Sequence, residues 1–162
     1  MKNGHVVDPA NDIDGQFDIG IKHGKIASVN ENIDLDKADD VIDVNRQIVM
    51  PGHIDTHAHV SSVFGNDANR AYGHAMLVQS GTTTALDLAG NPTIMAEGML
   101  RRGAGLNVAS LMGLVPHSTI SEDDPRPSVV RDVIDNTKKQ GGIGVKLLGG
   151  YHPFTPEASS NV

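Results

Sequence analysis

Residues 51–60, Pro51-Gly52-His53-Ile54-Asp55-Thr56-His57-Ala58-His59-Val60, organise the rest of the chain. Pro51-Gly52 ends the preceding element, and the residues after it predict a short strand. Strand side chains alternate between two faces, so the aspartate and the three histidines should share one face. Two imidazoles one pleat apart can reach the same small ion, and neutral imidazole is a favoured zinc ligand. The pattern predicts a metal site built on His57 and His59, with Asp55 orienting a histidine or completing the coordination.

The spacing alone leaves open the alternative that these histidines are structural and bind no metal, because a histidine in a strand commonly forms hydrogen bonds with its neighbours. Histidines are ample for a metal site. Four of the eight histidines fall in this strand or in the predicted helix after it: His53, His57, His59 and His74. Any metal must be held by histidine, carboxylate or a modified side chain, because the chain contains no cysteine.

Composition excludes several classes of protein. The 162 residues suggest one domain or slightly more, and 38% hydrophobic with 20% charged residues is typical of a globular protein. A formal net charge of −7 argues against nucleic acid or an anionic membrane as a partner. No apolar run is long enough to span a bilayer and no signal-peptide pattern is seen, so we expect a cytoplasmic location.

The first fifty residues read as short strands joined by turns. A hairpin is predicted where two alternating runs flank His23-Gly24. The acidic loop at 34–40 lacks the spacing and the glycine of an EF-hand, and we interpret it as a solvated loop. The predicted strands of this segment are 5–7, 18–22, 25–29, 41–44 and 47–50.

After His59 the pattern changes to strands alternating with helices, which predicts βαβ units and a parallel sheet or barrel. Asn91-Pro92 and Ser128 are predicted to begin helices, and Thr155-Pro156-Glu157 begins a further one. The predicted strands are 82–88, 107–115 and 143–148, and the predicted helices are 68–80, 91–102 and 128–140.

Lys146 is the unusual residue of the last predicted strand. Ile143, Val145 and Leu147 should face outer helices, which leaves Lys146 on the same interior face as the histidines if the strands close into a barrel. A buried unpaired ammonium costs several kcal/mol, so a lysine there needs a reason. The alternative is an open sheet from which Lys146 reaches solvent.

The run Pro-Gly-x-Ile-Asp-x-His-x-His at 51–59, entered from a polar, strand-rich segment, resembles the first barrel strand of the amidohydrolase superfamily. Within it, the chain is most similar to the dihydroorotase and hydantoinase-like cyclic amidases. The resemblance covers essentially the whole chain but only the first part of the family's length. It implies an α/β fold: residues 1–50 as an incomplete β-sandwich segment, then residues 51–162 as the first four units of a (β/α)8 TIM barrel.

The resemblance also implies the cofactors and site residues. It implies one or two divalent metal ions, zinc first, held by His57, His59 and a carbon-dioxide-derived carbamate on Lys146, the lysine of the fourth barrel strand. Asp87, His117 and His152 lie where substrate contacts are expected, although polar residues at loop mouths are often merely solvated. The activity implied is hydrolysis of a C–N bond other than a peptide bond, in a cyclic amide or an N-acyl amino compound, by a metal-activated water.

By the same resemblance, the remaining metal histidines and the catalytic aspartate stand on later strands. We therefore expect this chain to be a fragment that is inactive alone, and its open sheet edges to favour a homo-oligomer or another associating chain. The alternatives are a non-catalytic half-barrel module that pairs with another chain, and an unrelated βαβ binding protein in which the two histidines are incidental. The sequence does not identify the substrate or the metal.

Overall fold

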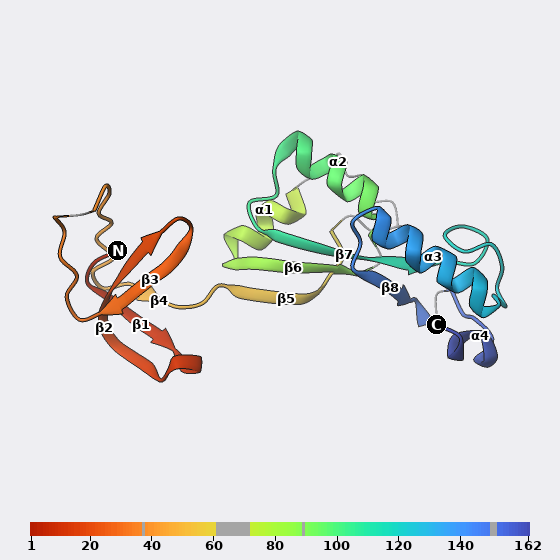
Figure 1. Cartoon of the computed structure of the whole chain (residues 1–162), viewed down its shortest axis with the longest axis horizontal. Helices are drawn as coiled ribbons and strands as arrows, with labels where there is room; N and C mark the ends of the chain where they lie inside the picture. Colours follow the sequence, from red (N-terminus) through yellow and green to blue (C-terminus); the bar gives the residue numbers. More distant parts are fainter. Residues whose placement is uncertain (37, 61–71, 89, 150–151) are drawn as a thin grey trace. The chain divides into compact units, whose positions relative to one another are not determined.

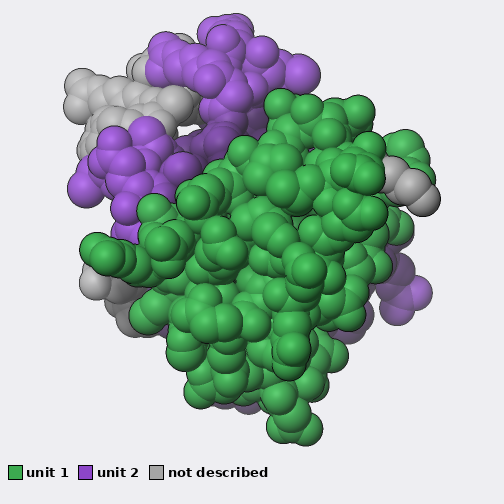
Figure 2. Space-filling model, turned by 90° about the vertical axis from the view of Figure 1, so that its left-hand side faces the viewer, with its two compact units in different colours: residues 1–51 green, residues 52–162 purple. Residues whose placement is uncertain are grey.

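The computed structural model describes residues 1–36, 38–60, 72–88, 90–149 and 152–162. The chain forms two compact units, Met1–Pro51 and Gly52–Val162, which are coloured separately in Figure 2. Residues 68–71 of the helix predicted at 68–80 lie outside the described ranges. Within those ranges, no helix has the length and apolar character that crossing a bilayer requires.

Unit 1 is a four-stranded sheet with the order β3-β2-β1-β4 (Figure 1). Its first three strands are antiparallel neighbours, whereas β4 runs parallel to β1. His23 and Gly24 join β2 to β3 with positive φ angles of 52° and 72°, as a two-residue hairpin turn requires, so the predicted hairpin is confirmed. The elements are β1 (Gly4–Asp8), the 3-10 helix η1 (Pro9–Asn11), β2 (Ile13–Lys22), β3 (Lys25–Asn30) and β4 (Ile48–Val49).

The strand predicted at 41–44 is wrong. Asp43 makes only an isolated parallel bridge to Lys2. Two backbone hydrogen bonds flank that bridge, from Lys2 N to Ile42 O at 2.8 Å and from Val44 N to Lys2 O at 2.9 Å. The apolar side chain of Ile42 is 59% exposed, so the β-branched composition that suggested a strand does not reflect burial here.

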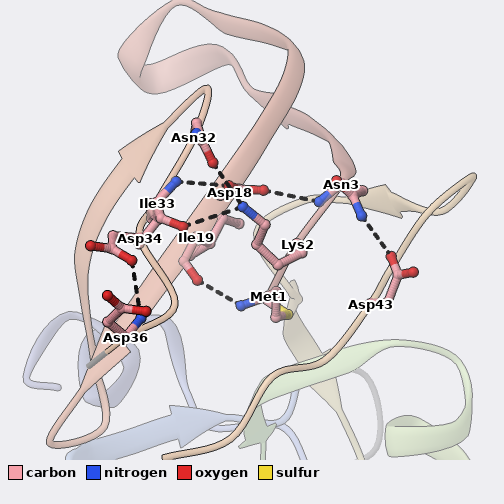
Figure 3. Close-up of polar contacts among 10 residues, drawn as sticks. All are labelled: Met1, Lys2, Asn3, Asp18, Ile19, Asn32, Ile33, Asp34, Asp36 and Asp43. Carbon is pink, nitrogen blue, oxygen red and sulfur yellow. Dashed lines mark hydrogen bonds and ion pairs between the residues drawn. The ribbon is translucent and has the colours of Figure 1, made fainter. Parts of the chain in front are cut away.

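A buried ion pair connects the start of the chain to β2 and to the loop after β3 (Figure 3). The carboxylate of Asp18, 2% exposed, pairs with Lys2 Nζ and accepts backbone N–H bonds from Asn3 at 3.0 Å and Ile33 at 2.9 Å. Lys2 also donates to Asn32 Oδ1 at 3.1 Å. Burial alone would raise the pKa of Asp18, but the bonds from Lys2, Asn3 and Ile33 outweigh it and lower the pKa to about 2.

Unit 2 is a parallel sheet in which strand and helix alternate, as the sequence predicts. The strand order is β5-β6-β7-β8, and α1 packs on β6, α2 on β7 and α3 on β8 (Figure 1). The strands are β5 (His53–Ala58), β6 (Thr82–Leu88), β7 (Asn107–Leu114) and β8 (Gly144–Leu147). The helices are α1 (Tyr72–Gln79), α2 (Pro92–Arg102), α3 (Pro127–Lys139) and α4 (Pro156–Ser160).

The two faces of this sheet differ in burial. Register partners in a parallel sheet share a face, so the pairs Asp87↔Ser110 and Gly113↔Lys146 mark opposite faces. The face of Asp87 and Ser110 is buried and also holds Ala85, Met112 and Leu114, none more than 7% exposed. Val145 and Leu147 pair with Met112 and Leu114 on this face, and α3 packs on β8, so the prediction that they face the helices is confirmed, although Leu147 is still 38% exposed at this edge strand. Ile143, which precedes β8, is 59% exposed.

Helix starts follow local side-chain chemistry in two of three cases. The side chain of Asn91 accepts bonds from Thr93 N and Ile94 N at 3.0 and 3.2 Å, which caps α2 as predicted. Thr155 Oγ1 likewise accepts from Ala158 N at 3.1 Å and caps α4.

Ser128, in contrast, does not cap α3. That helix begins at Pro127, with Arg126 as the preceding N-cap residue and no side-chain capping bond. Proline has its φ angle already fixed near the helical value and has no N–H to satisfy, so it favours the first helical position. The helix therefore begins one residue before Ser128.

Candidate metal centre

The side chains of His57 and Lys146 meet across the sheet. Lys146 Nζ lies 3.4 Å from His57 Nε2, although the two residues are 89 positions apart. They come from β5 and β8, the two edge strands of a four-stranded sheet. In a flat sheet those strands would lie about 14 Å apart, three spacings of about 4.8 Å. The contact therefore requires the sheet to curl toward the Lys146 face, as the strands of a barrel do.

His59 lies beside His57. The two ring centroids are 5.2 Å apart with the planes inclined at 66°, and both side chains are exposed. β5 ends at Ala58, so His59 is the first residue beyond the strand. Asp55 Oδ1 accepts the backbone N–H of His57 at 2.9 Å. Asp55 therefore fixes the backbone that carries the imidazole of His57, which is one way for it to orient this histidine.

His53 has a different neighbourhood. Its Nδ1 lies 3.4 Å from Thr82 Oγ1, at the start of β6. The register of β5 against β6 shifts between His53 and Ile54 and again between Asp55 and Ala58. Strict alternation therefore does not hold along β5: His53 pairs with Thr82 on the Lys146 face, whereas Asp55 pairs with Ala85 on the Asp87 face. The prediction that Asp55 shares one face with all three histidines is wrong.

The donor set of the centre is two imidazoles and one lysine amine. Among the described residues, no group of three histidines, cysteines or acidic residues is close enough to hold a metal ion. The exposed rings of His57 and His59 offer nitrogen lone pairs of the kind that zinc accepts. With half-buried Lys146 touching one of them, these residues fit a metal ion provided that the lysine contributes as a ligand.

The three residues predicted to contact substrate lie in separate settings. Asp87 is fully buried on the helix-covered face, and its Oδ1 accepts the backbone N–H of Val60 at 3.3 Å. His117 is exposed, with φ at 59°, and its Nδ1 lies 3.1 Å from Ser121 O. His152 is half-buried after β8. These contacts leave the substrate role a prediction for all three, and the burial of Asp87 favours support of the backbone instead.

The sequence indicates no role for His74, which lies on α1, the helix that packs against β6. It is 6% exposed, and its Nε2 has no hydrogen-bond partner among the described residues. Burial lowers the pKa of His74, while the nearby charge of Asp87 opposes that shift. The helical period places Gly73 and His74 on the side of α1 that faces the sheet, but only once the bounds of α1 are known. The sequence alone therefore does not indicate this orientation.

Proteins with sequences similar to this chain include dihydroorotases. No protein-family model matches the chain. A dihydroorotase of Elusimicrobium minutum is 37% identical over 125 residues, 71% of this chain and 28% of the relative. A dihydroorotase of Aquifex aeolicus is 43% identical over 60 residues, 37% of this chain and 14% of the relative. The matches therefore span less than a third of the length of these relatives.

Solved structures show the fold. A prolidase in complex with N-methylphosphonate-L-proline superposes with a TM-score of 0.64 at 19% identity, covering 96% of this chain and 48% of that one. An amidohydrolase superposes with a TM-score of 0.53 at 19% identity, with the same coverage. The fold is thus a partial (β/α)8 barrel with a separate small β-sheet, as the sequence predicted. Within that class, the resemblance to the dihydroorotase branch of the amidohydrolase superfamily is confirmed over the matched portion.

Proposed function

We propose that this chain carries part of the metal centre of a hydrolase that cleaves the C–N bond of a cyclic amide or an N-acyl amino compound. One observation carries the proposal: the 3.4 Å contact between Lys146 Nζ and His57 Nε2, made by the two edge strands of the sheet. The dihydroorotase relatives support the cyclic amide as the substrate class.

His57 and His59 would hold a divalent metal, zinc first, as neutral imidazoles. When bound, the metal supplies Lewis acidity that polarises the amide carbonyl and makes a water molecule acidic. Asp55 keeps the backbone of His57 in place through its bond to the His57 N–H. The exposed rings keep the centre open to a small substrate.

Lys146 would act as a carbamate. Its neutral amine adds to carbon dioxide, a nitrogen–carbon bond forms, and one proton leaves to solvent. The product is an anion with two oxygens, whereas an ammonium would repel a cation and donate to the very lone pair of His57 that the metal needs. After that change Lys146 would no longer compete for the lone pair of His57, and both residues would hold the metal.

By resemblance, the general base stands on a later barrel strand. We therefore propose that the 162 residues alone bind metal and show no turnover. Hydrolysis of a panel of cyclic amides by the purified 162-residue chain, lost in His57→Ala, would contradict that part of the proposal.

A second candidate is a non-catalytic half barrel that pairs with another chain or with a second copy. Its support is apolar exposure at both sheet edges, with Ile54 61%, Ile143 59% and Leu147 38% exposed. Analytical ultracentrifugation across a concentration series tests it: a monomer at all concentrations argues against self-association.

Zinc titration by calorimetry, together with metal analysis of the purified protein, tests the metal centre. We expect zinc affinity to fall at least about tenfold in His57→Ala and in His59→Ala. His5→Ala is the matched control, because His5 is an exposed histidine of unit 1 that pairs with Asp14. Equal zinc affinity in the wild type and both site variants would refute the site. Carbon-13 NMR after bicarbonate labelling should show a carbamate that is absent in Lys146→Ala.

A further inference from the structure

Two contacts fix the residue that directly follows His59. The backbone N–H of Val60 donates to Asp87 Oδ1 at 3.3 Å. On the side-chain side, Val60 lies so close to Gly73 of α1 that a Cβ atom placed on Gly73 would be 2.9 Å from Val60 Cγ1. Real Cβ contacts are not that short, so Val60 fits against α1 only because residue 73 is glycine. The chain leaving β5 is therefore held by both β6 and α1.

The acceptor of the Val60 N–H is in an unusual setting. Asp87 is 0% exposed and lies on the sheet face opposite Lys146, between β6 and α1. Its charge is felt by His74, which is also buried. A carboxylate in such a place is costly to desolvate unless hydrogen bonds compensate. One of the compensating hydrogen bonds comes from the Val60 N–H, in the segment that carries His57 and His59.

A hydrogen bond to the Val60 N–H constrains His59 in particular. That N–H belongs to the planar peptide group that contains the His59 carbonyl, so fixing it fixes the ψ angle of His59. Because His59 lies one residue past the end of β5, no strand ladder holds its carbonyl side. Ala58, the last strand residue, pairs in register with Asp87 itself. The Asp87 carboxylate thus holds the backbone just after the point where the pairing between β5 and β6 ends.

We propose that Asp87 is a positioning residue: through the Val60 N–H it sets the backbone direction at His59 and thereby holds the His57–His59 pair toward Lys146. The inference rests on the proposed metal centre and deepens it, because it names what preorganises two of the ligands. Asp87 acts from behind the sheet and touches no reacting atom.

The experiment compares three variants by cobalt titration, followed by visible absorption. Asp87→Leu keeps the branched shape, with bulkier methyl groups, and removes the acceptor, and we expect cobalt affinity about tenfold lower and an altered absorption spectrum of the bound ion. Asp87→Asn keeps an amide oxygen for the Val60 N–H and should restore both. Ser110→Ala is the matched control: Ser110 is the equally buried register partner of Asp87 on the same face, and its change should leave affinity and spectrum at wild-type values.

Amide hydrogen exchange of Val60 without metal separates this inference from the proposed function. Exchange should be faster in Asp87→Leu than in the wild type and protected again in Asp87→Asn. If the wild type binds no cobalt, the metal centre fails, while the exchange rates still decide whether Asp87 holds Val60. If the wild type binds cobalt and Asp87→Leu binds it equally with the same spectrum, the inference is overturned. Should Asp87→Leu not fold, Gly73→Ala, which displaces Val60 from the other side, must weaken cobalt binding.

Discussion

The two units each contain a lysine beside a group with which it can share a proton, in opposite surroundings. In unit 1, Lys2 pairs with Asp18, a carboxylate only 2% exposed that also accepts two backbone N–H bonds. In unit 2, Lys146 meets His57 where the contact is open to solvent. The first arrangement is satisfied by the protein alone. The second has lone pairs left over, and it is exposed enough to receive a ligand.

This difference separates a polar contact that stabilises the fold from one that we propose to bind a ligand. Removing a member of a buried, fully bonded pair leaves desolvated partners, so its role is measured as stability. Removing a member of an exposed pair leaves partners that water can solvate, so stability should change little. The effect is then expected in ligand binding, and the predictions below test this contrast.

The largest effect is expected for Asp18→Ala. The change leaves Lys2 and two backbone N–H groups without their shared acceptor, and we expect a loss of about 3 kcal/mol in the free energy of unfolding of unit 1. Urea titration followed by circular dichroism measures it. The control is Asp14→Ala, because the Asp14 side chain is 76% exposed in its pair with His5 and should change stability by less than about 0.5 kcal/mol. Similar losses in both variants would contradict the contrast.

Acid should weaken unit 1 through the same carboxylate. Its pKa is about 2 in the fold against an ordinary value of 3.8, so the folded protein holds Asp18 ionised more strongly than the unfolded chain does. The resulting stability is complete above pH 3.8 and is lost as the pH falls toward 2, a change of about 2 kcal/mol. Unfolding titrations across this range should show the loss in the wild type and a flatter profile in Asp18→Asn.

A smaller dependence on pH is expected from His74. Burial lowers the pKa of His74 below its ordinary 6.5, against the opposing charge of Asp87. Around and below pH 6.5 the unfolded chain therefore takes up a proton that the folded chain resists, and stability should decrease as the pH falls through and below 6.5. The difference between the wild type and His74→Gln isolates this contribution. Parallel profiles for the two proteins would show that His74 does not contribute.

The smallest change in stability is expected at the exposed centre. His57→Ala in metal-free protein should shift the free energy of unfolding by less than about 0.5 kcal/mol, because the ring is exposed and its contact with Lys146 is solvated. Zinc affinity should nevertheless fall sharply. Differential scanning calorimetry with and without zinc measures both. A large loss of stability without metal would place this contact in the structural class with Lys2–Asp18.

Much of unit 2 could be predicted because its signals are local or periodic. The cap at Asn91 and the β-branched run of β6 each depend on a few neighbouring residues, and both were predicted correctly. The meeting of His57 and Lys146 followed from the strand count and the alternation within the last strand only with the barrel closure that the family resemblance implied, because the residues alone also allowed an open sheet. The small sheet was less predictable at residues 41–44, where composition favours a strand but only one bridge forms.

The role of Asp87 could not be predicted for a physical reason. Whether a strand residue faces the interior or the helices depends on register against its neighbour, and the register of β5 shifts twice along six residues. Asp87 therefore looked like a residue at the mouth of the barrel. Its contact with the Val60 N–H depends on the tertiary packing of α1 on β6, which local patterns do not encode.

The curl of the sheet has a thermodynamic consequence. Because His57 and Lys146 belong to its two margins, an ion bound by both would fasten those margins together. Such an ion binds the folded chain and not the unfolded one, so resistance of this unit to heat should rise with the logarithm of free metal concentration once that exceeds the dissociation constant. A substitution that flattens the sheet, even far from the histidines, would then be detected first as weaker metal binding.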